Sequence, residues 1–299
     1  MKKNIILVSL IFAFCGGNAF AKLGDAGWVT LKKVQSPRFR SIAATSLTGR
    51  DLSGIFYNPS LISENDNKRL YVSSEFGFVK DTLGGFIYAQ PLKNGCISVT
   101  GMFYDAGTMD LNWINDNDVE TEKVPAQKDS LLMITYARKL KEKLSVGISV
   151  KHIDSTIARQ VSANANAVDL GLLYTLQDDM NAALSLNNLG KASAYVEKED
   201  PLPAILYCGL NKVFELNSIS LMPAVGYSYS LNEGAGVTDI GIEMVYNNFS
   251  INCGYKINME DLKLHTGFGI IHKKINLNYA FVPSSFFEST HRISLGYEF

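Results

Sequence analysis

From about residue 68 to the end of the chain, apolar and polar residues alternate in one short segment after another. A period of two predicts a β-strand with one apolar and one polar face. The alternation is clearest at 144–151, 167–174, 239–246, 249–256 and 274–281. The full pattern predicts fourteen strands, at 68–80, 82–92, 95–105, 128–140, 143–155, 164–177, 179–189, 202–214, 217–231, 236–247, 249–258, 261–272, 274–284 and 290–299.

The polar face of these predicted strands is rich in Ser, Asn, Gly, Asp and Lys. Such a face is too hydrophilic for the space between two packed sheets, but it suits a watery or ligand-lined lumen, with the apolar face toward lipid. Fourteen is also an even number, as expected for bacterial single-chain barrels. We therefore predict an all-β fold, a transmembrane antiparallel β-barrel of about fourteen strands over residues 68–299.

The predicted connections alternate between long and short. The long ones include 106–127, 156–163, 190–201, 232–235 and 285–289, whereas the others are tight turns. This asymmetry is typical of an outer-membrane barrel with long loops outside and both termini in the periplasm. We expect the longest, which contains Trp113, Ile114 and an acidic run, to be a solvated loop. A mixed apolar and acidic lid is the alternative.

The last predicted strand ends on the aromatic residues Tyr297 and Phe299. A terminal aromatic gains little in a soluble protein, where chain ends fray, but it belongs in the aromatic girdle of a membrane barrel. This ending also looks like the signal that barrel-assembly machinery recognises; an ordinary edge strand is the alternative. Pro223 lies inside the strand predicted at 217–231, where it removes a ladder hydrogen bond. We expect a tolerated kink there, and a local opening in the wall is the alternative.

The N-terminus has the features of a secretory signal peptide over residues 1–21. Lys2 and Lys3 precede a short apolar run, and Ala19-Phe20-Ala21 forms a cleavage site. The mature chain is therefore expected to begin at Lys22. The apolar run is too short to span a membrane as a helix, which takes about 20 residues.

Composition excludes several classes of function. The net charge is −1 and no basic patch occurs, so a nucleic-acid partner is not expected. The mature chain keeps three cysteines, an odd number whose spacing fits neither a full disulfide framework nor a metal site: Cys96, Cys208 and Cys253. The four histidines occupy separate strands or turns and form no known catalytic motif, so we expect neither an enzyme nor a cofactor.

Residues 22–67 do not alternate. Apolar residues at helical spacing over 28–34 are followed by a stretch rich in small residues and broken by Gly49, Gly54 and Pro59. A compact segment of this length ahead of a closed barrel is expected to be a hatch, or plug, because a wide lumen would otherwise leak. An open porin is disfavoured for the same reason.

The hatch has a recognisable order of residues. Arg40, Ala43 and Asp51 precede Tyr57-Asn58-Pro59-Ser60-Leu61, and this order resembles the N-terminal hatch of FadL-like outer-membrane barrels. The family has Asn-Pro-Ala where this chain has Asn58-Pro59-Ser60. Three further segments resemble the PorV/PorQ branch of that superfamily: 167–176, 184–190 and 201–210. The resemblance covers the whole mature chain and implies fourteen strands, an outer-membrane location and a hatch motif at Arg40, Asp51, Tyr57, Asn58, Pro59 and Ser60.

The resemblance implies two different functions. FadL-like barrels transport hydrophobic solutes such as fatty acids, and this is the first hypothesis. PorV-like members are accessories of type IX secretion that receive the C-terminal domain of exported cargo, and this is the alternative. The expected partners are outer-membrane lipid, a hydrophobic small molecule or a secreted cargo protein, and the barrel-assembly machinery during biogenesis.

A carrier of fatty acids needs a cation in the lumen for the carboxylate. Lys256, Lys263 and Arg292 are the candidates on the predicted inward faces. Because inward residues of both signs are interspersed, we expect most of them to pair with one another or with the hatch. We expect Asn58 to stabilise its own turn by bonding nearby backbone.

Overall fold

The computed structural model describes residues 27–33, 36–42, 51–77, 81–115, 118–176, 179–259, 261–286 and 288–299. The predicted signal peptide, the predicted mature N-terminus at Lys22 and Ala43 of the hatch motif lie outside the described residues.

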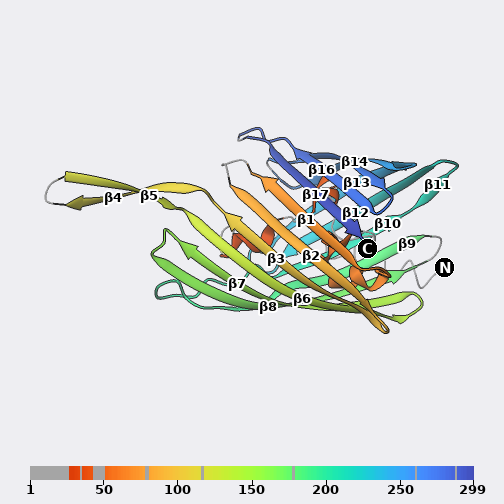
Figure 1. The fold of residues 1–299 in the computed structure, drawn as a ribbon, viewed down its shortest axis with the longest axis horizontal. Coiled ribbons are helices and arrows are strands. Elements are labelled where there is room, and N and C mark those ends of the chain that lie inside the picture. Colours follow the sequence, from red (N-terminus) through yellow and green to blue (C-terminus); the bar gives the residue numbers. More distant parts are fainter. Residues whose placement is uncertain are drawn as a thin grey trace.

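Fourteen antiparallel strands form a closed barrel (Figure 1). The sheet closes because the first strand pairs with the last, with Arg69 opposite Glu298, and because β10 pairs with β12. The strands are β1 (Arg69–Phe76), β2 (Thr82–Leu92), β3 (Gly95–Asp105), β6 (Gln127–Lys141), β7 (Leu144–Ile157), β8 (Val161–Thr175), β9 (Met180–Ala192), β10 (Ile205–Lys212), β12 (Ile219–Ser230), β13 (Ala235–Tyr246), β14 (Phe249–Ile257), β15 (Leu264–His272), β16 (Ile275–Val282) and β17 (Thr290–Glu298).

The sequence prediction of a fourteen-stranded barrel is confirmed, since each predicted range overlaps one of these strands. The strand predicted at 202–214 starts later than expected, because β10 begins only at Ile205. Pro201 and Pro203 lack the backbone N–H that a ladder requires, so the strand begins after them. No helix in the described part of the chain is long and apolar enough to cross a membrane.

The barrel has two different ends. At the turn end, several connections are two residues long, and Phe299 donates its backbone N–H to the carbonyl of Lys68 there. At the opposite end, which we call the loop end, the connections are longer and include residues 193–204.

Residues 106–127 are not the loop that the sequence predicted. They contain two strands, β4 (Thr108–Asn115) and β5 (Asp118–Pro125), which form a separate two-stranded sheet. In Figure 1 this hairpin projects beyond the loop end of the barrel. The physical reason is an alternation of Met109, Leu111 and Trp113 with polar residues, which the acidic composition of the second strand obscures.

Pro223 marks an interruption in one ladder of the wall. Asn211 pairs with Ala224, and β11 (Phe214–Leu216) then resumes the same register with Phe214 opposite Leu221. Between Asn211 and Phe214 the hydrogen-bond ladder to β12 is interrupted, because Pro223 has no N–H to donate. On its other side Pro223 keeps its place opposite Ile242 of β13. The wall is therefore interrupted locally without a change of register.

The outer face of the barrel is apolar. Large side chains such as Val150, Leu172 and Ile251 are exposed there, which lipid would cover. Near the turn end this face carries aromatic residues from several strands, as a membrane girdle requires: Tyr88, Tyr136, Tyr174, Tyr246, Phe249, Tyr297 and Phe299. The rings of Tyr297 and Phe299 meet edge to face, with centroids 5.1 Å apart.

The inner face is divided into two halves. On β13 to β17 most of the buried inward residues are polar or charged, as the sequence predicted, among them Asp239, Glu243, Asn252, His265, Asn278 and Arg292. On β2, β3, β6 and β7 many of them are apolar instead: Leu83, Ile87, Met102, Leu131, Met133 and Ile153. This apolar half packs against Leu52, Ile55 and Ile62 of the chain that precedes β1, so it forms a hydrophobic core rather than a watery wall.

Candidate functional site: the lumen and its N-terminal segment

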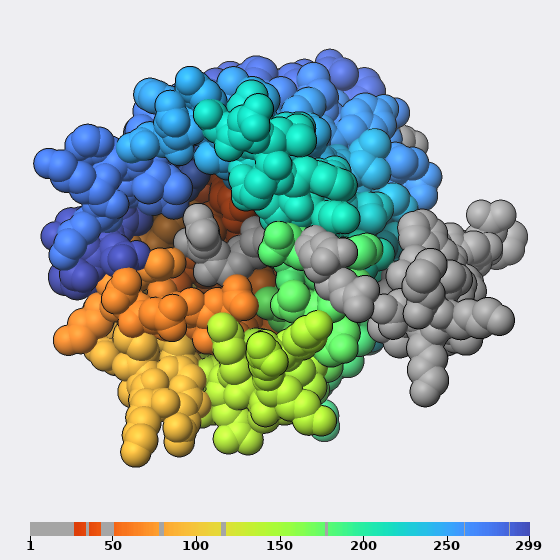
Figure 2. Space-filling model, turned by 90° about the vertical axis from the view of Figure 1, so that its right-hand side faces the viewer, coloured from red at the N-terminus to blue at the C-terminus, as the bar shows by residue number. Residues whose placement is uncertain are grey.

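The chain that precedes β1 lies on the inner side of the barrel wall. We call its described residues between 27 and 67 the N-terminal segment. They form short helices: η2 (Val29–Lys32), α2 (Pro37–Ser41), η3 (Leu52–Phe56) and η4 (Pro59–Glu64). Figure 2 shows red and orange atoms of this part of the chain inside the ring of strands. The segment begins at the loop end and reaches the turn end before β1.

At the loop end, η2 is held by partners from different parts of the rim. Lys32 pairs with Glu233 and Lys33 with Asp81, each with 2.5 Å between nitrogen and oxygen. Thr30 donates to Asp129 of β6. Because these contacts come from loops far apart in the sequence, they tie the segment across the mouth of the barrel.

A stacked aromatic pair covers the same mouth. The Trp28 ring lies 5.6 Å from the ring of Tyr195, which belongs to the 193–204 connection. Trp28 is buried and packs in the apolar half of the lumen.

Helix α2 lies against the polar half of the lumen. Ser36 caps it by accepting from the backbone N–H of Phe39. Arg38 makes a two-pronged contact with Glu243 of β13, at 2.7 Å from Nε to Oε1 and 2.5 Å from Nη2 to Oε2. Such a bidentate pair fixes both the position and the orientation of the Arg38 side chain against β13. The buried Ser41 hydroxyl accepts a hydrogen bond from Asn252 at 3.0 Å.

The predicted hatch motif contains two matching turns. Asp51 accepts hydrogen bonds from the backbone N–H and the hydroxyl of Ser53, at 2.9 and 2.5 Å. Asn58 does the same with Ser60, at 3.0 and 2.7 Å. Each side chain caps the short helix that follows it, η3 and η4. The serine two residues after each cap therefore has a structural role, which explains how Ser60 functions in the place of the family's alanine.

Asn58 also bonds to the wall. Its side-chain amide donates to the carbonyl oxygen of Leu172 in β8 at 3.0 Å. Next to it, Ser185 donates to the Tyr57 carbonyl, and Asn187 donates to that of Phe56 at 3.0 Å. The Tyr57–Asn58–Pro59 turn is thus joined to β8 and β9, in agreement with a structural role for Asn58.

Within the segment, Tyr57 is buried and Arg40 is partly buried. The Tyr57 ring packs at 5.5 Å from Phe39 and 5.8 Å from Tyr207 of β10, and burial raises the pKa of its phenol. Burial lowers the pKa of the Arg40 guanidinium, although Tyr57 and Asp239 partly offset this effect. Both side chains support the packing of the hatch motif.

The three candidate cations are not brought together. Lys256 pairs with Asp239 at 2.7 Å, and Arg292 pairs with Glu75 of β1. Lys263 lies exposed in the connection before β15. Two of the three are thus neutralised within the wall.

Three buried polar residues, which the sequence analysis did not predict to lie together, meet at a bulge between β8 and β9. Lys151 is 2.6 Å from Asp169 and donates to Asn188 at 2.8 Å. The Asn188 backbone N–H donates to Asp169 in turn, and its φ of 61° is a left-handed conformation that asparagine tolerates. The register shifts here between Val168 and Leu170. Two consecutive asparagines, Asn187 and Asn188, were the sequence feature that could have indicated this bulge.

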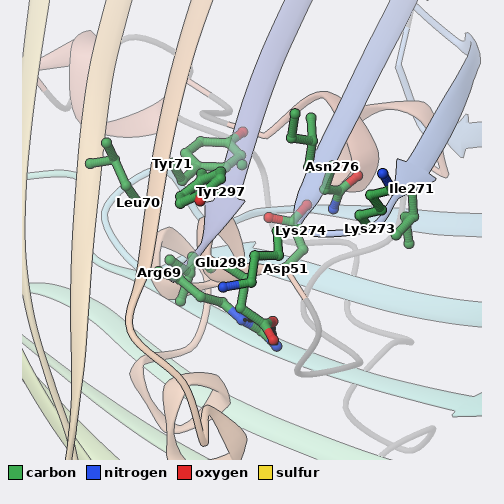
Figure 3. Close-up of a pocket in the computed structure, with 13 residues that line it drawn as sticks. Asp51, Arg69, Leu70, Tyr71, Ile271, Lys273, Lys274, Asn276, Tyr297 and Glu298 are labelled. Carbon is green, nitrogen blue, oxygen red and sulfur yellow. Dashed lines mark hydrogen bonds and ion pairs between the residues drawn. The ribbon is translucent and has the colours of Figure 1, made fainter.

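Cavities occur at both ends of the barrel. One of about 560 Å³ lies at the loop end beside Leu83, Tyr104 and Asp129, and two smaller ones open toward the turn end. One of about 270 Å³ lies between the segment and the ends of β1, β16 and β17, where Arg69 points toward Glu298 and forms an ion pair at 2.7 Å (Figure 3). A neighbouring one of about 450 Å³ is lined by Arg38, Glu243 and Asp179, among others. Below η2, by contrast, the cavity beside Lys33 and Lys151 measures only about 20 Å³. That is room for about one water molecule.

Among the described residues, no group of three His, Cys, Asp or Glu side chains could hold a metal ion. Of the three described cysteines, Cys96 and Cys208 are buried and Cys253 is exposed.

Comparisons with known proteins agree with this architecture. The family model described as type IX secretion system membrane protein PorP/SprF matches residues 130–299. No curated protein matches the chain. The family that matches is thus PorP/SprF, whereas the resemblance noted in the sequence was to the PorV/PorQ branch.

Several solved structures share the fold. The toluene transporter TodX of Pseudomonas putida is 14% identical, with a TM-score of 0.62 over 89% of this chain and 98% of that one. The CymD monoaromatic hydrocarbon channel is 12% identical, with a TM-score of 0.61 over 89% and 97%. A FadL homologue of Pseudomonas aeruginosa is 9% identical, with a TM-score of 0.59 over 89% and 99%. At these identities the likeness concerns the fold alone, and this chain shares the barrel fold of the FadL homologue and of the two hydrocarbon channels.

Proposed function

Because the chain belongs to the type IX secretion system membrane protein PorP/SprF family and forms an outer-membrane barrel, we propose that it assists type IX secretion of a cargo protein. The observation that carries this proposal is the family match over residues 130–299. The cargo or its C-terminal domain would then bind the barrel rather than pass through it.

The geometry of the lumen supports this proposal. η2 and the adjoining Lys33 are tied to Glu233, Asp81 and Asp129 at the loop end. Asn58, which caps η4, is bonded to β8. A lumen filled by its own chain suits a binding platform better than a channel in constant use. In this proposal the N-terminal segment acts as a plug, and the barrel needs neither a catalytic step nor a cofactor.

We further propose an orientation in the membrane. The turn end, with Phe299, faces the periplasm, and the loop end, with the β4–β5 hairpin, faces outward. Tyr297 and Phe299 would then serve as the signal for the barrel-assembly machinery. The sequence analysis predicted that both termini lie in the periplasm. In the proposed orientation Phe299 does so, whereas Gly27, the first described residue, lies at the loop end near Asp200. Lys22, the predicted mature N-terminus, is outside the described residues.

Uptake of a hydrophobic solute is the second candidate. Two observations favour it: the fold of hydrocarbon channels, and the apolar half of the lumen formed by residues such as Met102, Leu131 and Ile153. For a solute to bind there, the N-terminal segment would have to move, because its residues Leu52, Ile55 and Ile62 occupy the apolar half of the lumen.

Deletion of the gene separates the two candidates. The deletion strain is assayed for uptake of radiolabelled oleate and for periplasmic retention of a protein that is normally exported by type IX secretion. Retention with normal oleate uptake supports the secretion role. Normal export with reduced oleate uptake overturns it in favour of solute transport. Complementation with the wild-type gene is the control for both measurements.

A further inference from the structure

The β4–β5 hairpin presents one face with an unusual combination of side chains. In an antiparallel pair, directly opposite residues share a face. Met109 is opposite Val124, Leu111 is opposite Glu122, and Trp113 is opposite Glu120. One face therefore carries an apolar row on β4 beside an acidic row on β5.

This face is accessible in the structure. The exposed fractions are 42% for Met109 and 39% for Trp113, and Glu120 and Glu122 are exposed. On the opposite face at the tip, Ile114 and Val119 are 80% and 68% exposed. A two-stranded ribbon with such side chains is at best marginally stable by itself and gains stability when a third strand is added. The surface is thus suited to a partner.

The hairpin is held in place at its base rather than attached by a loose linker. Ala106 donates its N–H to Gln127 at 3.0 Å, and Ala126 donates to Gly107 at 2.8 Å. The carbonyl of Ala126 accepts from Ala158 of the next connection at 3.1 Å. The ribbon therefore continues the direction of β3 and β6 beyond the barrel (Figure 1). A fixed ribbon loses less conformational entropy on binding than a mobile loop does.

The chemistry of the face selects among possible occupants. A second copy of the hairpin would place its own acidic row against Glu120 and Glu122, which like charges disfavour. An anionic lipid surface is disfavoured for the same reason. A segment with lysine or arginine fits instead, because the methylene stems of these residues cover apolar side chains such as Leu111 and Trp113 while their charges reach the carboxylates.

The edge of the ribbon gives the mode of binding. β4 carries a single acidic residue, Asp110, between its apolar and neutral residues, whereas β5 carries Asp118, Glu120, Glu122 and Lys123. Charged side chains along an edge oppose the addition of a strand. An extended partner would therefore pair with the edge of β4.

We propose that the β4–β5 hairpin is a docking ribbon for an extended protein segment of alternating basic and apolar residues, which adds to β4 as a third strand. Backbone hydrogen bonds provide the pairing, and Glu120 and Glu122 select for positive charge. The inference is independent of the proposed function, since it holds whether the barrel assists secretion or takes up a solute.

The test uses the fluorescence of Trp113 in the full-length barrel, purified in detergent micelles. The chain has two tryptophans, so Trp28→Phe leaves Trp113 as the only reporter. The probe is a ten-residue peptide of alternating valine and lysine with blocked ends. We expect saturable binding with a blue shift of the emission. The same peptide with glutamate in place of lysine, or with two central prolines, is expected to bind at least tenfold more weakly.

Matched variants locate the binding surface. Glu120→Gln/Glu122→Gln is expected to weaken binding of the valine–lysine peptide at least tenfold. Glu197→Gln/Glu199→Gln, which removes two exposed acidic residues from another connection at the loop end, is expected to leave it unchanged. Heat-modifiable migration verifies that each variant is folded.

Several outcomes would overturn the proposal. These are equal weakening by both double variants, equal binding of the valine–glutamate peptide, or dimers that form through the hairpin in sedimentation experiments. Binding of the hairpin to phosphatidylglycerol vesicles in preference to the peptide would overturn it as well.

Discussion

Gly147 of β7 and Gly171 of β8 lie directly opposite one another, and the Asn58–Pro59 turn rests on both of them. A side chain at Gly147 would overlap the backbone of Pro59 and Ser60, and one at Gly171 would overlap Asn58 and Pro59. The wall is therefore shaped for this turn, because only glycine lets two backbones approach so closely.

Gly171→Ala is predicted to displace the Asn58–Pro59 turn from the wall. Overpacking of this kind costs about 1–3 kcal/mol. We expect a lower temperature for the loss of heat-modifiable migration, together with a higher conductance in planar bilayers. Gly84→Ala is the matched control, since its nearest atom, the Ser73 carbonyl oxygen, would lie at an ordinary 3.7 Å. Equal effects of the two substitutions would contradict the close-packed arrangement.

Asn58→Ala is predicted to lower the free energy of unfolding by about 1–3 kcal/mol, because it leaves buried hydrogen-bonding groups without a partner. Asn58→Asp keeps the acceptor for Ser60 but loses the donor to Leu172, so it separates the cap from the link to the wall. Denaturation of the detergent-solubilised barrel by guanidinium measures the free energy of unfolding of both variants. A stability of Asn58→Ala equal to wild type would refute this structural role.

Lys32→Ala/Lys33→Ala is predicted to loosen η2 from the loop end, because both ion pairs with the rim are lost. The expected result is a raised single-channel conductance, and high salt should produce part of the same effect in the wild type by screening. The exchange Lys32→Glu/Glu233→Lys should restore closure at that contact. Lys263→Ala, which removes an exposed charge at the same end, is the control. An unchanged conductance in the double variant would count against a plug that is held by charge.

Lys151→Met is predicted to destabilise the barrel by about 3–5 kcal/mol, because it leaves Asp169 buried and unpaired at the bulge. The double variant Lys151→Met/Asp169→Asn should recover part of this loss, as a double-mutant cycle would measure. Lys128→Met breaks the pair with Asp105, whose side chains are 58% and 43% exposed, and should cost no more than about 1 kcal/mol. Similar losses for both lysine variants would argue against the buried pair.

The orientation can be tested by labelling of whole cells with a membrane-impermeant maleimide. In a Cys253→Ser background, Glu122→Cys in the hairpin should be labelled. Lys273→Cys in the turn before β16 should be labelled only after the outer membrane is permeabilised. The reverse pattern would show that the turn end faces outward.

Local sequence patterns were sufficient to predict the wall of the barrel. Residues 144–151 of β7 and the whole of β17 alternate strictly, as a strand between lipid and a polar lumen requires. The β4–β5 hairpin was not predicted, because charged residues on its second strand resemble a solvated loop. Its pairing became visible only when Met109 was placed opposite Val124.

The charged residues of the lumen show the limit of the sequence more clearly. Lys256, Lys263 and Arg292 share an inward prediction, yet each has different surroundings in the structure: Asp239, solvent and Glu75. Pairing across a closed sheet depends on the barrel's register and curvature, and neither can be read from the periodicity of one strand.

The sequence by itself determined the class of this protein: an outer-membrane barrel of fourteen strands, preceded by a segment with the order of residues of a FadL-like hatch. Periodicity and turn chemistry are local, so they survive in a linear chain. Only the tertiary structure decided that half of the lumen is a hydrophobic core, that Gly147 and Gly171 receive the Asn58 turn, and that the acidic run lies on a projecting ribbon. The first two depend on contacts between residues far apart in the sequence, which become neighbours only when the strands enclose the N-terminal segment, and the third depends on the pairing of β4 with β5.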